Sequence, residues 1–137
     1  MAHWLFKTES SEYSYADLER DQHVVWEGVA NATALIHLRA VRKGDTVVVY
    51  RSGKDKAAVG LAGVTRGPYP DPKLGDAKRV VVDLKPLRAF TVRIPLADFR
   101  TDSVLRTTEL VRISRLSVLP LTDAHYARVL QLAQADA

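Results

Sequence analysis

An aromatic residue, a glycine and a helix-capping residue lie within six positions of one another, at Trp26, Gly28 and Asn31. Gly28 permits a tight turn with a positive φ, and the Asn31 side chain can accept a backbone N–H at the start of a helix. A tryptophan beside a helix N-terminus suits a planar, electron-rich or anionic ligand. The alternative is that Trp26 is an ordinary core tryptophan, and this stretch alone leaves both interpretations open.

Polar residues also follow two predicted strands and could meet Trp26 at one rim. The segment 7–10 (Lys-Thr-Glu-Ser) ends the first strand, and the segment 50–52 (Tyr-Arg-Ser) ends a central strand. If the sheet between them curls, several of these strand ends lie together and form a binding site. The alternative for Lys7 and Glu9 is a surface ion pair, which contributes only about 0–1 kcal/mol to stability.

The sequence offers little for catalysis or for a metal. The four histidines are scattered at positions 3, 23, 37 and 125, and the chain has no cysteine. None of the histidines has a metal-ligand spacing, and no nucleophile elbow, P-loop or dinucleotide-binding motif is present. We therefore expect a protein that is not an enzyme and that uses no metal or other cofactor. Hydrolysis of a modified nucleotide would need an activated nucleophile or a metal.

Apolar periodicity and turn residues predict the elements that must position these residues. Ser14 opens a short helix with a capping box, and a second helix begins after Asn31 and closes at 42–45 with Gly44 as a left-handed cap. Thr122 caps a closing helix. Further short helices are expected at 95–99 and 102–109. The predicted strands are 3–7, 46–50, 57–66, 80–84, 90–94 and 115–119, the last stopped by Pro120.

Two features of these strands bear on the fold. Gly60 and Gly63 mark a bend or bulge that curls a sheet, whereas three prolines within 68–72 predict an exposed loop over 67–79. The elements do not alternate as strand–helix–strand units. The fold class we expect is α+β, a small mixed β-barrel of five or six strands with short peripheral helices.

Composition places the chain among globular proteins. Its 137 residues fit a single domain over 1–137, with 47% hydrophobic and 26% charged residues and a net charge of +4. The basic balance mildly favours an anionic partner. No apolar run is long enough to span a membrane, and the N-terminus lacks a signal-peptide pattern, so we expect no membrane partner and a cytoplasmic location. The sequence leaves the oligomeric state open.

Five short blocks in the same order resemble the EVE domain family, a PUA-like group related in fold to YTH and ASCH domains. They are residues 4–14 (Trp-Leu-Phe-Lys-Thr-Glu-Ser-Ser-Glu-Tyr-Ser), 26–29 (Trp-Glu-Gly-Val) with Asn31, 38–40 leading to 43–45, 69–72 (Tyr-Pro-Asp-Pro), and 115–118 with 120–122. Each block is weak alone, but together they span almost the whole chain. The resemblance implies a PUA-like barrel whose pocket reads a flipped, often modified, base of DNA or RNA.

Carried over by position, the family's base-binding pocket has a defined set of residues here. They are Lys7, Thr8, Glu9, Ser10, Trp26, Gly28, Val29, Asn31, Tyr50 and Ser52, with Arg115 and Ser117 at the edge. The chain departs from the family at Ser10, where proline is usual, and at Arg51, where histidine often stands. The family's arginines, glutamine and asparagine at the second helix are replaced by Ala30, Thr33, Leu35 and Ile36. These losses change which groups the site can hydrogen-bond.

The resulting hypothesis is that an unstacked base rests against Trp26, with Tyr50 opposite and the backbone of 28–31 at its polar edge. The candidate phosphate contacts are Arg39, Arg42, Lys43, Arg51 and Lys54, each of which could equally be a solvated surface charge. The sequence decides neither the base nor the choice between DNA and RNA. The alternative function is a protein-interaction or small-ligand module that kept the barrel and lost nucleic-acid binding.

Overall fold

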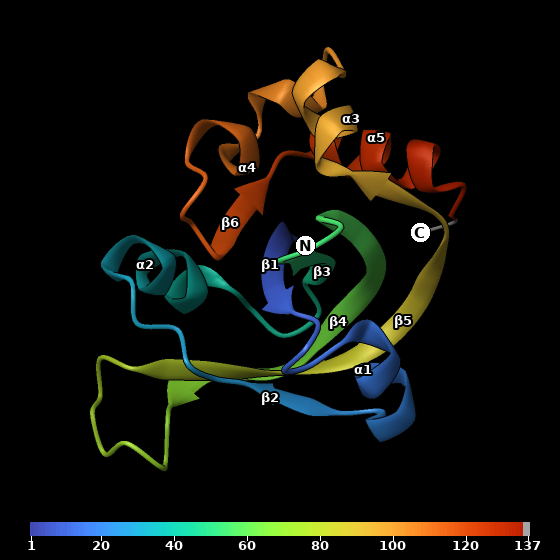
Figure 1. Cartoon of the computed structure of the whole chain (residues 1–137). Coiled ribbons are helices and arrows are strands. Elements are labelled where there is room, and N and C mark those ends of the chain that lie inside the picture. The colour runs from blue at the N-terminus through green and yellow to red at the C-terminus, as the bar shows by residue number, and fades with distance from the viewer. Residues whose placement is uncertain (136–137) are drawn as a thin grey trace.

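A computed structural model describes residues 1–135 as one six-stranded sheet with helices around it (Figure 1). The elements in chain order are β1 (His3–Glu9), α1 (Tyr15–Asp21), β2 (Val24–Trp26), α2 (Ala32–Ala40), β3 (Thr46–Ser52), β4 (Ala57–Pro70), β5 (Val80–Pro95), α3 (Leu96–Thr101), the 3-10 helix η1 (Leu105–Thr107), α4 (Glu109–Arg112), β6 (Val118–Leu121) and α5 (Asp123–Ala133). None of the helices within residues 1–135 is long and apolar enough to cross a membrane.

The strands follow the order β2-β5-β4-β3-β1-β6, and β1 with β3 is the parallel pair. The long strands β4 and β5 change register at several points, including beside Gly60, and these bulges bend the sheet. Figure 1 shows the bent strands wrapping around the position of β1. Within the described residues β2 and β6 remain edges, so the curled sheet does not close on itself. The expected α+β class and strand number are confirmed.

Local capping explains where three helices begin. The side chains of Ser14 and Thr122 each form a capping box, and Asn31 Oδ1 accepts the Ala34 N–H at 3.0 Å. The expected end of α2 was wrong, because the helix stops at Ala40 and the next residue is extended. Gly44 has a positive φ of 93°, but it uses this conformation in the turn before β3.

The prolines interrupt the sheet less than the sequence predicts. Strand β4 continues through 67–70, and β5 is a single strand where two were expected. Pro68 lies unpaired where the β4–β5 register shifts, so its missing N–H costs no ladder bond, and Pro86 pairs with Ala62 next to another such shift. The loop is therefore shorter, covering 71–79, and it is exposed except at its ends, where Asp71 is buried and Arg79 half-buried. Pro120 lies inside the edge strand β6, which begins at Val118.

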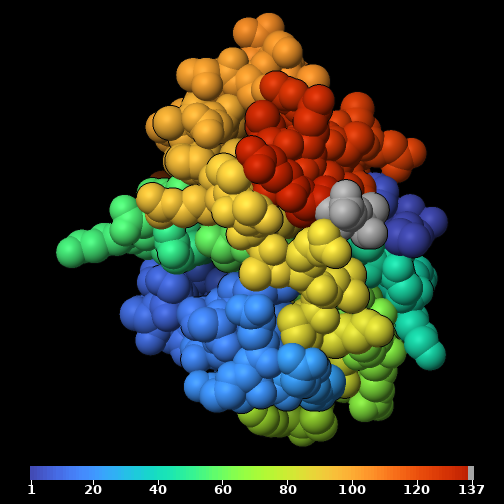
Figure 2. Space-filling view, turned by 90° about the vertical axis from the view of Figure 1, so that its right-hand side faces the viewer, coloured from blue at the N-terminus to red at the C-terminus, as the bar shows by residue number. Residues whose placement is uncertain are grey.

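The core fills the inside of the curled sheet and the space beneath the C-terminal helices. Its largest fully buried side chains include Phe6 inside the curl and Phe99 on α3. Figures 1 and 2 show the C-terminal helices α3, α4 and α5 together at one end, with α1 and β2 at the other. The short segment expected at 102–109 divides into η1 and α4 within this helical group. The ends of β1 and β3 lie between the two regions.

Candidate functional site

The C-terminal ends of β1 and β3 lie side by side, as the sequence predicts. Their parallel pairing places Lys7 opposite Tyr50 and Glu9 opposite Ser52. The Ser52 hydroxyl donates a hydrogen bond to the Thr8 carbonyl oxygen at 3.2 Å, which fastens the two ends. Polar residues from two strands therefore gather at one rim, and cavities open on either side of it.

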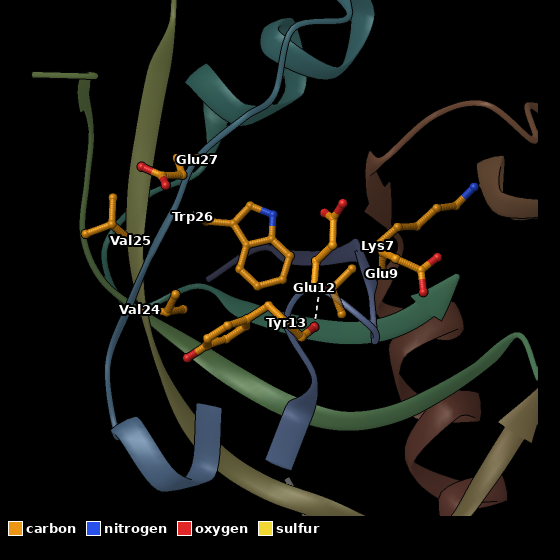
Figure 3. Close-up of a pocket in the computed structure, with 9 residues that line it drawn as sticks. Lys7, Glu9, Glu12, Tyr13, Val24, Val25, Trp26 and Glu27 are labelled. Atoms are coloured by element: carbon orange, nitrogen blue, oxygen red, sulfur yellow. Dashed lines mark hydrogen bonds between the residues drawn. The ribbon is translucent and has the colours of Figure 1, made fainter. Parts of the chain in front are cut away.

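The first cavity, here named the Trp26 cavity, has a volume of about 390 Å³ and lies between the end of β1 and the edge strand β2 (Figure 3). It is lined by Lys7, Thr8, Glu9, Glu12, Tyr13, Val24, Val25, Trp26 and Glu27. A cavity of this size falls within the usual range for small-molecule sites.

Trp26 is both a core residue and a cavity wall. Its ring packs against Phe6 with centroids 5.6 Å apart, and only 9% of the residue is exposed. The indole N–H has no hydrogen-bond partner within residues 1–135. Because no fully buried polar side-chain atom in this part of the chain lacks a partner, the indole N–H is accessible to solvent, and Figure 3 shows the indole among the residues that line the cavity. The two interpretations of Trp26 thus apply to different parts of the same ring.

Tyr13 supplies the second aromatic ring of this cavity. Figure 3 shows its ring beside that of Trp26. The Tyr13 hydroxyl donates to Asp21 at 3.0 Å, and the Thr8 hydroxyl donates to the Tyr13 carbonyl at 2.5 Å, so α1 and β1 both hold the residue. Burial and the bonded Asp21 carboxylate raise the pKa of Tyr13 to about 12, so the ring stays neutral at physiological pH.

The mouth of the Trp26 cavity is acidic, with three glutamates against Lys7. Figure 3 shows the Glu12 side chain next to the indole, while Glu27 lies on the other side of β2, where it pairs with Lys73 at 3.1 Å. Glu9 points to the β3–β4 turn and packs on Gly53 so closely that a Cβ there would lie 2.5 Å from its carboxylate. Glu12 is therefore the carboxylate best placed to meet a ligand beside Trp26.

A second cavity of about 380 Å³, here named the basic cavity, lies on the far side of Lys7 beneath the C-terminal helices. It is lined by Lys7, Tyr50, Ser52, Lys56, Leu96, Arg100, Leu110, Val111, Ser114, Arg115 and Ser117. This lining, drawn from the described residues, includes four cationic side chains and no carboxylate. The basic cavity is thus opposite in charge to its neighbour.

Lys7 belongs to both cavities. Its ammonium group points away from Trp26 (Figure 3), donates to the Ser114 carbonyl at 2.7 Å and lies 5.9 Å from the centre of the Tyr50 ring. Burial, with the nearby Lys56 charge as a second cause, lowers the pKa of Lys7 below its usual value. The charged form of Lys7 is therefore short of a compensating anion.

Tyr50 does not face Trp26, contrary to the sequence hypothesis. Successive side chains of a strand point to opposite faces, so Phe6 meets Trp26 on one face of β1 while Lys7 meets Tyr50 on the other. Tyr50 is only 2% exposed and sits edge-on to Phe99. The aromatic residue that accompanies Trp26 is Tyr13.

The other predicted base-binding residues are divided among several places. The Trp26 cavity has Lys7, Thr8, Glu9 and Trp26, and the basic cavity has Lys7, Tyr50, Ser52, Arg115 and Ser117. Ser10 and Arg51 line a smaller cavity of about 170 Å³.

The turn of residues 28–31 lines none of these three cavities. Asn31 caps α2, and the Val29 carbonyl accepts a hydrogen bond from Arg79 at 3.0 Å. The expected contact between the backbone of this turn and a base in the Trp26 cavity is therefore not supported by its position. Gly28 has the predicted positive φ of 83°.

The candidate phosphate contacts lie at two ends of the sheet. Arg39, Arg42 and Lys43 precede β3 and lie at the opposite end of that strand from Ser52. Arg39 donates to the Lys78 carbonyl at 2.9 Å, and Arg42 donates to the Arg39 carbonyl at 2.7 Å.

The two remaining phosphate-contact candidates lie nearer the rim formed by the ends of β1 and β3. Arg51 and Lys54 are at the β3–β4 end, where Arg51 Nε donates to the Asp55 carbonyl at 3.0 Å. Phosphate binding by any of the five stays a prediction.

Sequence reasoning missed Glu12 and Tyr13 in the first cavity and Lys56 and Arg100 in the second. A signal existed for the first pair, since both residues stand in the same opening block, 4–14, as Lys7 and Glu9. No signal existed for the second pair. Lys56 and Arg100 come from separate segments that only the packing of the C-terminal helices brings together.

Comparison with known proteins gives a consistent family match. The family model described as EVE domain matches residues 2–132. Human thymocyte nuclear protein 1 is 28% identical over 169 residues, covering 98% of this chain and 75% of that protein. An NMR structure from Rhodopseudomonas palustris has a TM-score of 0.93 and 33% identity, covering 98% of this chain and 94% of the other.

Two further solved structures bear on the site and on the fold. The crystal structure of human THYN1 in complex with 5-methylcytosine-containing DNA has a TM-score of 0.89 and 28% identity, with both chains fully covered. An ASCH protein from Zymomonas mobilis has a TM-score of 0.61 at 8% identity and covers 96% of this chain and 99% of the other. The second match shows a shared fold and carries no functional information.

Proposed function

Because this chain belongs to the EVE domain family, we propose that it binds nucleic acid and receives an unstacked cytosine-type base, including 5-methylcytosine, in the Trp26 cavity. The observation that carries the proposal is the open indole edge of Trp26 beside a cavity of about 390 Å³. The human relative crystallised with 5-methylcytosine-containing DNA supports the choice of ligand.

Different residues of the Trp26 cavity contact different parts of the base. The rings of Trp26 and Tyr13 offer aromatic surface for stacking, which contributes about 1–3 kcal/mol per base. The Glu12 carboxylate can only accept hydrogen bonds when ionised and therefore suits the amino group of cytosine. The free indole N–H donates to an acceptor atom of the base. Thymine presents an oxygen where cytosine has its amino group, and Glu12 would repel it.

Energetics favour a base that is easily unstacked. Extruding a paired base costs a few kcal/mol, which is similar to what stacking on the two rings returns. Single strands and weakened pairs should therefore bind more tightly than intact duplexes. The methyl group of 5-methylcytosine adds only about 0.8 kcal/mol when buried, so the preference over cytosine should be several-fold.

Fluorescence anisotropy with single-stranded oligonucleotides tests the proposal directly. Three probes of one sequence would carry a single 5-methylcytosine, cytosine or thymine at the centre. We expect affinities in that order, with Trp26 fluorescence changing on binding. Equal affinity for all three probes would overturn base recognition in this cavity.

We propose that the protein acts by binding alone. The Thr8 hydroxyl, which lies in the same cavity as Trp26, donates its hydrogen bond to the Tyr13 carbonyl and is not hydrogen-bonded to a general base within residues 1–135. Among the described residues no cluster of acidic and histidine side chains has the arrangement of a metal site. Incubation of the 5-methylcytosine oligonucleotide with the protein, followed by mass spectrometry, should return an unchanged strand.

One observation favours the alternative of a small-ligand module. The acidic mouth of the Trp26 cavity repels phosphate and suits a neutral or cationic ligand. Salt dependence separates the two functions, because neutralising about three phosphates gives a log–log slope of about −2.7 on duplex DNA and about −2.1 on a single strand. A flat response would favour the small-ligand module. The cytoplasmic location stays a prediction of the sequence.

A further inference from the structure

We propose that the basic cavity binds a phosphate group of the same nucleic-acid strand whose base enters the Trp26 cavity. The identity of the strand rests on the proposed function, whereas the preference for an anion rests on the cavity itself. Four cations, Lys7, Lys56, Arg100 and Arg115, face this space with no carboxylate in its lining.

Among the described residues, three of the four cations of the basic cavity have no side-chain partner of their own. Lys56, Arg100 and Arg115 make no side-chain hydrogen bond or ion pair with any residue in 1–135. Some other arginines do pair with carboxylates, as Arg128 does with Asp102 at 2.9 Å and Arg112 with Glu109 at 3.6 Å. The donors of Lys56, Arg100 and Arg115 are therefore available to an external anion.

The remaining polar groups of the basic cavity suit phosphate oxygens. Ser114 and Ser117 bring hydroxyl donors to the same lining, whereas the Ser52 hydroxyl already donates to the Thr8 carbonyl. Serine hydroxyls, arginine and lysine are all among the groups that hydrogen-bond phosphate oxygens in protein–DNA complexes. A phosphate between Lys7 and Lys56 would offset the repulsion and burial that lower the pKa of Lys7.

The position of Lys7 connects this anion to the base. Its stem lines the Trp26 cavity, and its ammonium group is held on the other side by the Ser114 carbonyl at 2.7 Å (Figure 3). The two cavities therefore share one side chain as a wall. A nucleotide carries its base and its phosphate on one sugar. The Trp26 cavity can therefore hold a base while the adjacent basic cavity holds the phosphate of the same or the next nucleotide.

Short ligands test this inference without the rest of a strand. The probes are 5-methyl-2′-deoxycytidine and its 5′- and 3′-monophosphates, titrated by intrinsic tryptophan fluorescence. We expect one of the monophosphates to bind at least about tenfold more tightly than the nucleoside, since hydrogen bonds to charged groups are the stronger class. The Lys56→Gln, Arg100→Gln double variant should lose this advantage and keep the affinity of the protein for the nucleoside.

A matched control separates the cavity from the overall charge. Lys85 is an exposed residue of β5. Its register partner on β4 is Gly63, which pairs in turn with Thr46 at the opposite end of β3 from Ser52. Lys85→Gln should leave the advantage of the monophosphate intact. Both substitutions in the double variant are on exposed side chains, and thermal melts followed by circular dichroism confirm that the variant is folded.

The outcomes distinguish this inference from the proposed function. If the nucleoside binds and neither monophosphate binds more tightly, the phosphate site is overturned while the base site stands. If the double variant keeps the full advantage, the phosphate lies elsewhere and the basic cavity is overturned. If inorganic phosphate shifts the amide signals of Arg100 and Ser114 while no nucleoside binds, the anion site exists and the proposed function fails.

Discussion

The Trp26 cavity and the basic cavity have nearly equal volumes and share Lys7, yet their linings carry opposite charge. The first joins two aromatic rings to an acidic mouth, and the second joins four cations to serine hydroxyls. A carboxylate that accepts the amino group of a base repels a phosphate at the same distance. Separate cavities allow one protein to bind both parts of a nucleotide, and each difference between them can be tested.

The largest effect is expected from Trp26→Ala, which removes the ring of the first cavity and leaves the second untouched. Loss of stacking should weaken base-dependent binding by about 1–3 kcal/mol, which is roughly five- to 150-fold. Because the ring also packs on Phe6, the same change should cost about 3–5 kcal/mol of folding stability. Trp26→Phe, which keeps the packing, separates the two effects when affinity and denaturant unfolding are both measured.

A smaller effect should follow from Glu12→Gln, which changes the charge of the first cavity without changing its size. A neutral amide can also donate hydrogen bonds, so the preference for cytosine over thymine should fall by about 1–3 kcal/mol. Paired anisotropy titrations with the cytosine and thymine probes measure it. Glu27→Gln is the matched control, because Glu27 also lines the cavity but pairs with Lys73 on the other side of β2 from the indole. A preference that survives in Glu12→Gln would assign base selection to another group.

Gly53→Ala should act on the rim between the two cavities. Gly53 has a φ of 84°, and a Cβ there would collide with the Glu9 carboxylate. We expect a loss of about 1 kcal/mol of folding stability from the backbone conformation alone, with further loss if Glu9 cannot move. Chemical denaturation measures the change. Gly44→Ala also has a positive φ but meets nothing within 4 Å, so it reports the backbone cost by itself.

The smallest effect concerns the pH dependence of Lys7, the residue that the cavities share. Its pKa is lowered in the folded protein, so the ammonium form is lost at a lower pH than for an ordinary lysine. Binding of a monophosphate should therefore weaken as pH rises through this lowered pKa, before the usual range near 10.5 is reached. Nucleoside binding should change less. An identical pH profile for both ligands would remove Lys7 from the phosphate site.

Much of the fold was predictable because its signals are local. Ser14, Asn31 and Thr122 begin helices through hydrogen bonds to residues three positions away, so neighbouring residues suffice to identify them. The prolines at 68, 86 and 120 were misread as breaks. Their tolerance depends on bulges and on an edge position, and both are properties of strand pairing that a single segment does not contain.

The sequence by itself predicted that Lys7, Glu9 and Trp26 meet at one rim if the sheet curls, because Lys7 and Glu9 end the first strand and Trp26 opens the turn before the second helix. Only the tertiary structure decided which faces they share. The parallel register of β1 and β3 puts Tyr50 with Lys7 on the face opposite Trp26. The charge of each cavity was likewise decided by packing, since Lys56, Arg100 and Arg115 come from three segments that meet only when the C-terminal helices fold over the sheet. Electrostatic fields add over distances in space, and distance along the chain does not report them.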